Sequence, residues 1–138
     1  MSRPGLALCL ALAASLCCGC GKLRQVSACR AVAREVNGAV DEIDALSKKK
    51  PVDEARIARR YGDLARALEP RSTGVTTLAA AVKDYVAIVR GTEAALKARG
   101  EAAKLPYARV GESTRELDRL VKREHAAVAR IEAECGAH

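Results

Sequence analysis

The side chains best able to do chemistry in this chain are its cysteines, three of which lie close together near the N-terminus. Cys17 and Cys20 have the Cys-x-x-Cys spacing of a thiol–disulfide redox motif. That spacing falls inside an apolar run, and no strand–helix unit of the thioredoxin type surrounds it. The c-type haem pattern also fails, because Gly21 rather than His follows Cys20. The cluster therefore predicts neither redox nor haem chemistry.

The other reactive side chains form no catalytic or metal-binding constellation. His125 and His138 are the two histidines, whereas a structural zinc site needs four Cys or His ligands and a di-iron bundle needs Glu-x-x-His on two helices. No serine has the glycines of a nucleophile elbow around it, and no glycine-rich phosphate loop is present. We therefore expect a protein that is not an enzyme and that holds no metal or cofactor.

The cysteine cluster ends a segment with the order of an export signal. Arg3 is followed by an uncharged run of small and apolar residues from Pro4 to Gly21, and Lys22 carries the next charge. This run is at the lower limit of the roughly 20 apolar residues that cross a bilayer. We therefore favour a cleaved signal peptide over a membrane-spanning helix.

Gly19 and Cys20, with Leu16 upstream, resemble the lipobox of a bacterial lipoprotein precursor. The resemblance implies that residues 1–19 are a signal peptide, that Cys20 carries palmitate or a similar acyl chain, and that residues 20–25 are a tether. Two or more acyl chains suffice for stable anchoring, so a membrane is an expected partner through the N-terminal lipid.

The same resemblance implies a location, and it leaves the processing site open. Gly21 stands where retention at the inner membrane would place Asp, which implies the outer membrane, facing the periplasm. Leu16 lies one position further upstream than in the usual lipobox, so Cys17 and Cys18 stay open as the processed cysteine. An ordinary signal peptide cut after Ala13 is the other interpretation, and it would give a secreted or periplasmic protein.

Breaker residues divide the rest of the chain into four amphipathic segments. In each segment apolar side chains recur at alternating spacings of three and four, the pattern of a single helix face. Pro51 suits the first turn of the second helix, and Gly100 suits the C-terminal cap of the third. The expected helices span residues 26–48, 52–68, 75–99 and 106–135.

Four such helices joined by short loops can bury their apolar faces only against one another. Aromatic residues make up 2% of the chain, with no Phe and no Trp, which disfavours a sheet. The sequence therefore predicts an all-α fold, an antiparallel up-down-up-down four-helix bundle over residues 26–138, with an elongated helical-hairpin dimer as the alternative. Val75 opens the expected third stripe, and the fourth consists of Tyr107, Val110, Thr114, Leu117, Val121, Glu124, Val128, Ile131 and Cys135.

Cys29 and Cys135 are expected to form a disulfide. Cys29 opens the apolar stripe of the first helix and Cys135 closes that of the fourth, and these ends share a pole in an up-down-up-down bundle. Export would place both thiols in an oxidising compartment. Closing a loop of about 100 residues would stabilise the fold by up to roughly 4–5 kcal/mol in the chain-entropy model. Two buried, unpaired thiols are the alternative.

Glu124 is the one charged residue on the fourth stripe. Leu120 and Ala127 lie near enough to continue the apolar surface past it, so we expect its carboxylate to reach solvent or to pair with a nearby Lys or Arg. Four glycines occur singly within the expected helices and off the stripes, where we expect tolerated, exposed positions, with close helix contact or bending as the alternative: Gly38, Gly62, Gly91 and Gly111.

The charge balance of the chain is basic. The net charge is +7, and Arg3 is the only charged residue before Lys22. A basic group on the expected second helix would attract an anionic partner, namely Arg56, Arg59, Arg60 and Arg66. Export argues against nucleic acid, as does the assignment of all three tyrosines to helix stripes. An envelope protein or an anionic envelope polymer is the expected partner, and a mixed, solvated surface is the alternative.

These observations favour a small lipid-anchored protein of the bacterial cell envelope that acts as a non-enzymatic interaction or structural module. The alternative is a periplasmic-facing helical bundle that carries a small apolar or anionic ligand between its helices. A tightly closed bundle would favour the module. A continuous internal pocket of several hundred Å³ would favour the carrier.

Overall fold

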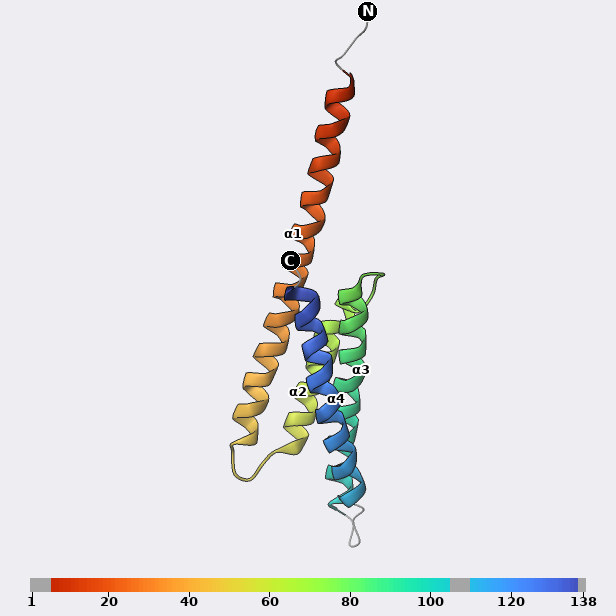
Figure 1. Cartoon of the computed structure of the whole chain (residues 1–138). Coiled ribbons are helices and arrows are strands. Elements are labelled where there is room, and N and C mark those ends of the chain that lie inside the picture. The colour runs from red at the N-terminus through yellow and green to blue at the C-terminus, as the bar shows by residue number, and fades with distance from the viewer. Residues whose placement is uncertain (1–5, 105–109, 137–138) are drawn as a thin grey trace, which may run out of the picture.

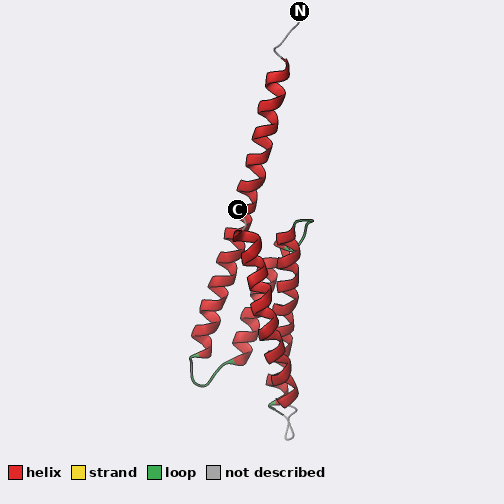
Figure 2. Ribbon diagram, viewed as in Figure 1, coloured by secondary structure: helices red, strands yellow, loops and turns green. Residues whose placement is uncertain are grey.

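The computed structural model describes residues 6–104 and 110–136, with side chains from residue 21 onward except that of Val110. The described chain contains α1 (Leu6–Ser47), α2 (Glu54–Leu68), the short 3-10 helix η1 (Glu69–Arg71), α3 (Thr77–Ala102) and α4 (Val110–Gly136), and no strand (Figure 2). Successive long helices run in opposite directions, and the C-terminal end of α4 lies beside α1 (Figure 1). The predicted all-α four-helix bundle is confirmed.

Local side-chain hydrogen bonds explain where α2 and α3 begin. The carboxylate of Asp53 accepts a hydrogen bond from the backbone N–H of Arg56 at 2.9 Å, so α2 begins after Pro51 and not with it. The hydroxyl of Thr76 accepts from the N–H of Ala79 at 3.1 Å and caps α3 in the same way. Val75, expected to open the third stripe, therefore precedes the helix and is fully exposed.

The third helix also ends later than its glycine predicted. Gly100 lies inside α3, which continues to Ala102. The N–H of Ala103 then donates to the carbonyl oxygen of Arg99 at 3.0 Å, a helical hydrogen bond that needs no left-handed residue. Gly100 is therefore not the C-terminal cap.

The first helix is longer than the sequence pattern predicted. Residues 20–25, expected as a tether, are helical and continue α1 without interruption, and the N-terminal part of α1 projects beyond the other helices as a single rod (Figure 1). Ala and Leu dominate this segment, and no Pro lies between Pro4 and the end of α1 at Ser47, so no proline stops helix propagation. None of the described helices combines the length and apolar character needed to cross a membrane.

The core is centred on α3, which packs against both α2 and α4. Val82, Tyr85 and Val89 of α3 are completely buried, together with Leu64 and Leu68 of α2. Helix α1 contributes Val32 and Ala39 to the same core. A smaller cluster extends it between α1, α2 and α3, through Leu46, Ile57, Ala58 and Leu96. In the first three helices the core is therefore built mostly from apolar side chains that recur at spacings of three and four, as the sequence pattern predicted.

The buried face of α4 differs from the predicted one. Thr114 and Val121 are exposed, Leu120 and Ala127 are buried in their place, and Ile131 is buried as predicted. Helix α4 packs extensively on α3 but little on α1, so its buried face is turned toward α3. Tyr107 and the side chain of Val110 lie outside the described residues.

Candidate functional site

The four arginines singled out in the sequence line one groove between α1 and α2. Arg56, Arg59, Arg60 and Arg66 lie on α2, and Lys49 follows the end of α1. The groove encloses about 510 Å³ and also contains Glu42 of α1 and Asp63 of α2, with Ala45 and Leu46 as its apolar part. We call these nine residues the basic groove. Lys49 was not among the predicted site residues, because only its place beside α2 reveals its role.

Two of the five cations in the basic groove are paired with its two acids. Arg60 is the less exposed, with 21% of its side chain accessible, and its Nε lies 2.5 Å from Oε2 of Glu42. Arg66 pairs with Asp63 one turn away. Within the described chain, Lys49, Arg56 and Arg59 have no carboxylate within ion-pair distance, and all three are exposed. The groove therefore keeps a net charge of +3.

The helical repeat explains why these arginines share a surface. At about 100° per residue, positions 56, 59, 60 and 66 fall within one side of α2, while Ile57, Leu64 and Leu68 occupy the buried side. The amphipathic pattern of α2 thus builds the core and the basic groove at the same time.

The predicted disulfide is present at one pole of the bundle. Cys29 of α1 is bonded to Cys135 of α4, with their Cα atoms 5.7 Å apart. Beside it the side-chain amide of Gln25 donates to the carbonyl oxygen of Glu134 at 3.5 Å. These links tie together two helices that otherwise contact each other little.

A second groove lies between α1 and α4. It consists of two adjoining hollows of about 320 and 450 Å³ that share Val36, Asn37 and Val128. The first hollow is mainly apolar and begins at the Cys29–Cys135 disulfide. The second reaches Tyr61 and Tyr85 on α2 and α3. We call the pair of hollows the α1–α4 groove. It is a surface groove, since Val40 on its wall is 49% exposed, and it is not the continuous internal pocket that would favour a ligand carrier.

Glu124 lies in the second hollow with the two tyrosines. The hydroxyl of Tyr85 donates a hydrogen bond to Oε1 of Glu124 at 3.2 Å. Desolvation raises the pKa of Glu124 above its usual value, although the Tyr85 hydrogen bond and His125 oppose the rise. Burial and the Glu124 charge raise the pKa of Tyr61 to about 12, and they raise that of Tyr85 further.

The expected Lys or Arg partner of Glu124 is absent from the described residues. Its carboxylate lies on the side of α4 that faces α3 and α1, where the Tyr85 hydroxyl is the hydrogen-bonding group within reach. The two tyrosines were assigned to helix stripes in the sequence. Tyr61, Tyr85 and Glu124 come from three different helices and lie at a similar level along the bundle. This proximity can be predicted only after the helices have been aligned with one another.

Two of the four helical glycines are not the exposed positions expected. Gly62 is buried, and a Cβ there would lie 2.6 Å from the carboxylate of Glu93. A Cβ at Gly91 would lie 3.1 Å from Leu120 of α4. These glycines therefore allow α2 and α4 to approach α3 closely. Gly38 and Gly111 have no neighbour within 4 Å of such a Cβ.

The residues predicted to carry the anchor are placed only in part. The backbone of Cys17, Cys18 and Cys20 lies within α1, but their side chains, like Arg3 and His138, lie outside the described residues. Acylation at Cys20 stays a prediction. Across the described ranges, no three His, Cys, Asp or Glu side chains gather where they could hold a metal ion.

Comparison with known proteins finds no family model, no curated protein and no solved structure that matches this chain. The two grooves are therefore interpreted from their own chemistry.

Proposed function

We propose that this protein is a small lipid-anchored module of the bacterial cell envelope that binds an anionic envelope polymer in its basic groove and catalyses no reaction. The observation that carries the proposal is the convergence of Lys49, Arg56 and Arg59, none with a carboxylate in ion-pair distance within the described chain, in one groove of net positive charge. Exposed cations gathered in a hollow concentrate anions by long-range attraction.

The pairing of Arg60 with Glu42 supports this use of the groove. This ion pair joins α1 to α2 and occupies the least exposed cation of the groove, which leaves the three exposed cations to an external anion. Arg guanidinium groups can bind phosphate or carboxylate oxygens through two parallel N–H bonds, so Arg56 and Arg59 fit a polymer that carries either group.

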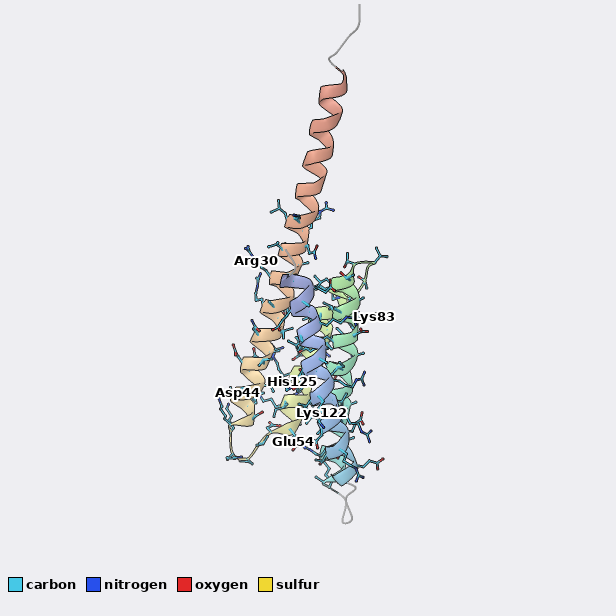
Figure 3. The ribbon with its side chains drawn as sticks, viewed as in Figure 1. Arg30, Asp44, Glu54, Lys83, Lys122 and His125 are labelled. Atoms are coloured by element: carbon cyan, nitrogen blue, oxygen red, sulfur yellow. A yellow bond between two sulfur atoms is a disulfide. The ribbon has the colours of Figure 1, made fainter. Side chains whose placement is uncertain are left out.

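The place of the groove along α1 favours a polymer over the lipids of the anchoring membrane. Ser47 is 27 residues after Cys20 on the same helix, which corresponds to roughly 40 Å at 1.5 Å per residue. Arg30 lies near the end of the bundle that adjoins the N-terminal rod, and Asp44 and Glu54 lie near the opposite end (Figure 3). Screening falls off over about 8 Å at physiological salt, so an acylated Cys20 would leave the groove far from its own membrane surface.

The groove is tested by reversing its three exposed, unpaired cations. The variant Lys49→Glu, Arg56→Glu, Arg59→Glu should bind inorganic polyphosphate and poly-L-glutamate roughly 3- to 150-fold more weakly, since each of the three exposed charges contributes roughly 0.2–1 kcal/mol. The matched control changes three exposed cations elsewhere, Lys83→Glu, Lys122→Glu and Arg123→Glu, and alters the net charge equally. Equal weakening in both variants would show that only net charge matters and would reject the groove.

The anchor is tested independently of the groove. Mass spectrometry of the mature N-terminus should find an acylated Cys20, and Cys20→Ala should release the protein from membranes. An unmodified N-terminus at Ala14, or a Cys20→Ala protein that stays attached, would contradict the anchor. Neither result would bear on polymer binding.

A further inference from the structure

The α1–α4 groove has one apolar end and one polar end. Its first hollow runs from the disulfide along Val32, Val36, Val128 and Ile131 and is predominantly apolar, with one cation and one carboxylate, Arg30 and Glu132, also in its lining. Asn37 and Val128 continue this wall into the second hollow, which Tyr61 and Glu124 line with polar atoms. Behind them the completely buried Tyr85 donates its hydroxyl hydrogen bond to Glu124. A linear molecule would therefore meet an apolar surface along one part of its length and a polar group at its end.

The polar end lacks a cation. Glu124 is half-buried, yet within the described residues no Lys or Arg lies in ion-pair distance, and its hydrogen-bond partner is the neutral hydroxyl of Tyr85. A partly desolvated carboxylate is costly unless a positive charge compensates it. A ligand could supply the missing charge.

The other charged groups around this hollow do not supply it. Asp44 adds a second carboxylate from α1 and is itself engaged by Lys48 at 2.5 Å. His125 of α4 is the one basic residue in the lining of this hollow, and it lies on α4 at about the level of Asp44 on α1 (Figure 3). The α1–α4 groove is therefore acidic at its polar end, opposite in sign to the basic groove.

We propose that the α1–α4 groove binds a single-chain amphiphile with a positively charged nitrogen head group. The ammonium pairs with the carboxylate of Glu124 beside Tyr61 and Tyr85, and the alkyl chain lies along Val36, Val128 and Ile131. A tyrosine ring attracts an alkylammonium group through its negative face, and the partly exposed Tyr61 can add this attraction to the charge pairing, whereas the completely buried Tyr85 acts through its hydrogen bond to Glu124. Glu124 and Cys135 are 11 residues apart on α4, so the groove follows the helix for roughly 16 Å at 1.5 Å per residue.

This site is separate from the proposed function. It uses a different pair of helices and the opposite charge, so either could fail while the other holds. It also differs from a carrier of anionic ligands, because an anionic head group would meet two carboxylates at the polar end.

Dodecylamine is a suitable probe, used below its micelle concentration with dodecanol and dodecanoate as its neutral and anionic counterparts. The protein contains no Trp and three Tyr, two of which line the groove, so tyrosine fluorescence reports binding directly. Dodecylamine should bind saturably at one site and more tightly than dodecanol, and dodecanoate should bind most weakly. Non-saturable binding, or dodecanoate binding as tightly as dodecylamine, would overturn the proposal.

Two variants separate the two ends of the groove. Glu124→Gln preserves the side-chain shape and should weaken dodecylamine at least about tenfold, the size of a lost charge pair, while leaving dodecanol unchanged. Asp118→Asn, at an exposed position of the same helix, is its matched control. Ala33→Phe places a large side chain in the apolar hollow and should weaken dodecylamine and dodecanol alike, whereas Ala94→Phe on the exposed face of α3 should not.

Each variant can refute the proposal independently. Unchanged dodecylamine binding in Glu124→Gln would remove the head-group site, and unchanged binding in Ala33→Phe would remove the alkyl-chain site. Circular dichroism of each variant establishes that the helical fold is retained, and the Ala33→Phe measurement remains decisive if Glu124→Gln does not fold.

Discussion

The α2–α3 interface and the α1–α4 interface use the same kinds of side chains and differ in how closely these pack. Leu64 and Val82 at the first interface are at most 1% exposed. Val36 and Val128 at the second are only partly buried and line a groove. Burial in this bundle is therefore set by which helices come into close contact, and apolar character alone does not determine it.

The two interfaces also differ in their polar links. Arg99 of α3 holds both carboxylate oxygens of Glu54 of α2, with Nε–Oε2 and Nη2–Oε1 distances of 2.9 and 2.5 Å. Among the described residues no ion pair joins α1 to α4, and the disulfide and the Gln25 hydrogen bond are both at one pole. The α1–α4 interface is thus linked at one pole by the disulfide and the Gln25 hydrogen bond, and it forms an open groove along the rest of its length.

Removing the disulfide should destabilise the α1–α4 interface and should cause the largest change in the free energy of unfolding. Cys29→Ser with Cys135→Ser should lower the free energy of unfolding by up to about 4–5 kcal/mol, since the bond closes a loop of 106 residues. Amide hydrogen exchange should rise first in α1, because little else holds that helix to α4. Reducing agent should reproduce both effects in the wild type and leave the double variant unchanged. A reduced wild type that keeps its stability would contradict the prediction.

Truncating one valine to alanine at each interface should lower the free energy of unfolding by different amounts, both smaller than the loss caused by removing the disulfide. Val82→Ala should cost about 2–3 kcal/mol, from lost burial and from a cavity in a closely packed core. Val128→Ala should cost less than about 1 kcal/mol, because water already reaches that side chain in the groove. Urea unfolding of the two variants measures both values. Equal costs would show that the α1–α4 groove is closed in solution.

The helical periodicity was sufficient to predict the bundle and its disulfide. Val32, Leu64 and Val82 are core residues because each lies on an apolar stripe that one helix can bury on only one side. The up-down-up-down order then places Cys29 and Cys135 at one pole, and the structure has them bonded.

The register of α4 and both grooves could not be predicted in the same way. Val121 and Leu120 are adjacent apolar residues, so the sequence allows two overlapping stripes, and only the close packing of α4 on α3 selects Leu120. The arginine surface on α2 was predictable from helical spacing, but the contribution of Lys49 was not, because it follows a different helix. Grooves depend on the separation of helices, which a one-dimensional pattern does not contain.

The smallest expected change in the free energy of unfolding comes from the charge of Glu124. Whether this charge stabilises or destabilises the fold follows from the raised pKa of its carboxyl group. An acid whose pKa is higher in the folded protein than in the unfolded chain holds its proton more strongly when folded. It therefore stabilises the fold fully below its unfolded pKa, near 4.5, and that stabilisation is lost as the pH rises through the folded pKa. At neutral pH the wild type carries an ionised, poorly solvated carboxylate in the groove.

Glu124→Gln should accordingly be more stable than the wild type at pH 7, by less than about 1 kcal/mol because water in the open groove screens the charge. The difference should shrink or reverse as the pH falls toward 4.5, where the wild-type carboxyl becomes neutral as well. His125 lowers the pKa of Glu124 and so opposes this effect, and the series should therefore be repeated with His125→Asn. Asp118→Asn, exposed on the same helix, should show no such pH dependence.

Thermal unfolding between pH 4 and pH 8 measures these differences in stability. A Glu124→Gln protein that is less stable than the wild type across this whole range would contradict the prediction. It would mean that the charge of Glu124 is well compensated in the fold and that the α1–α4 groove has no missing charge.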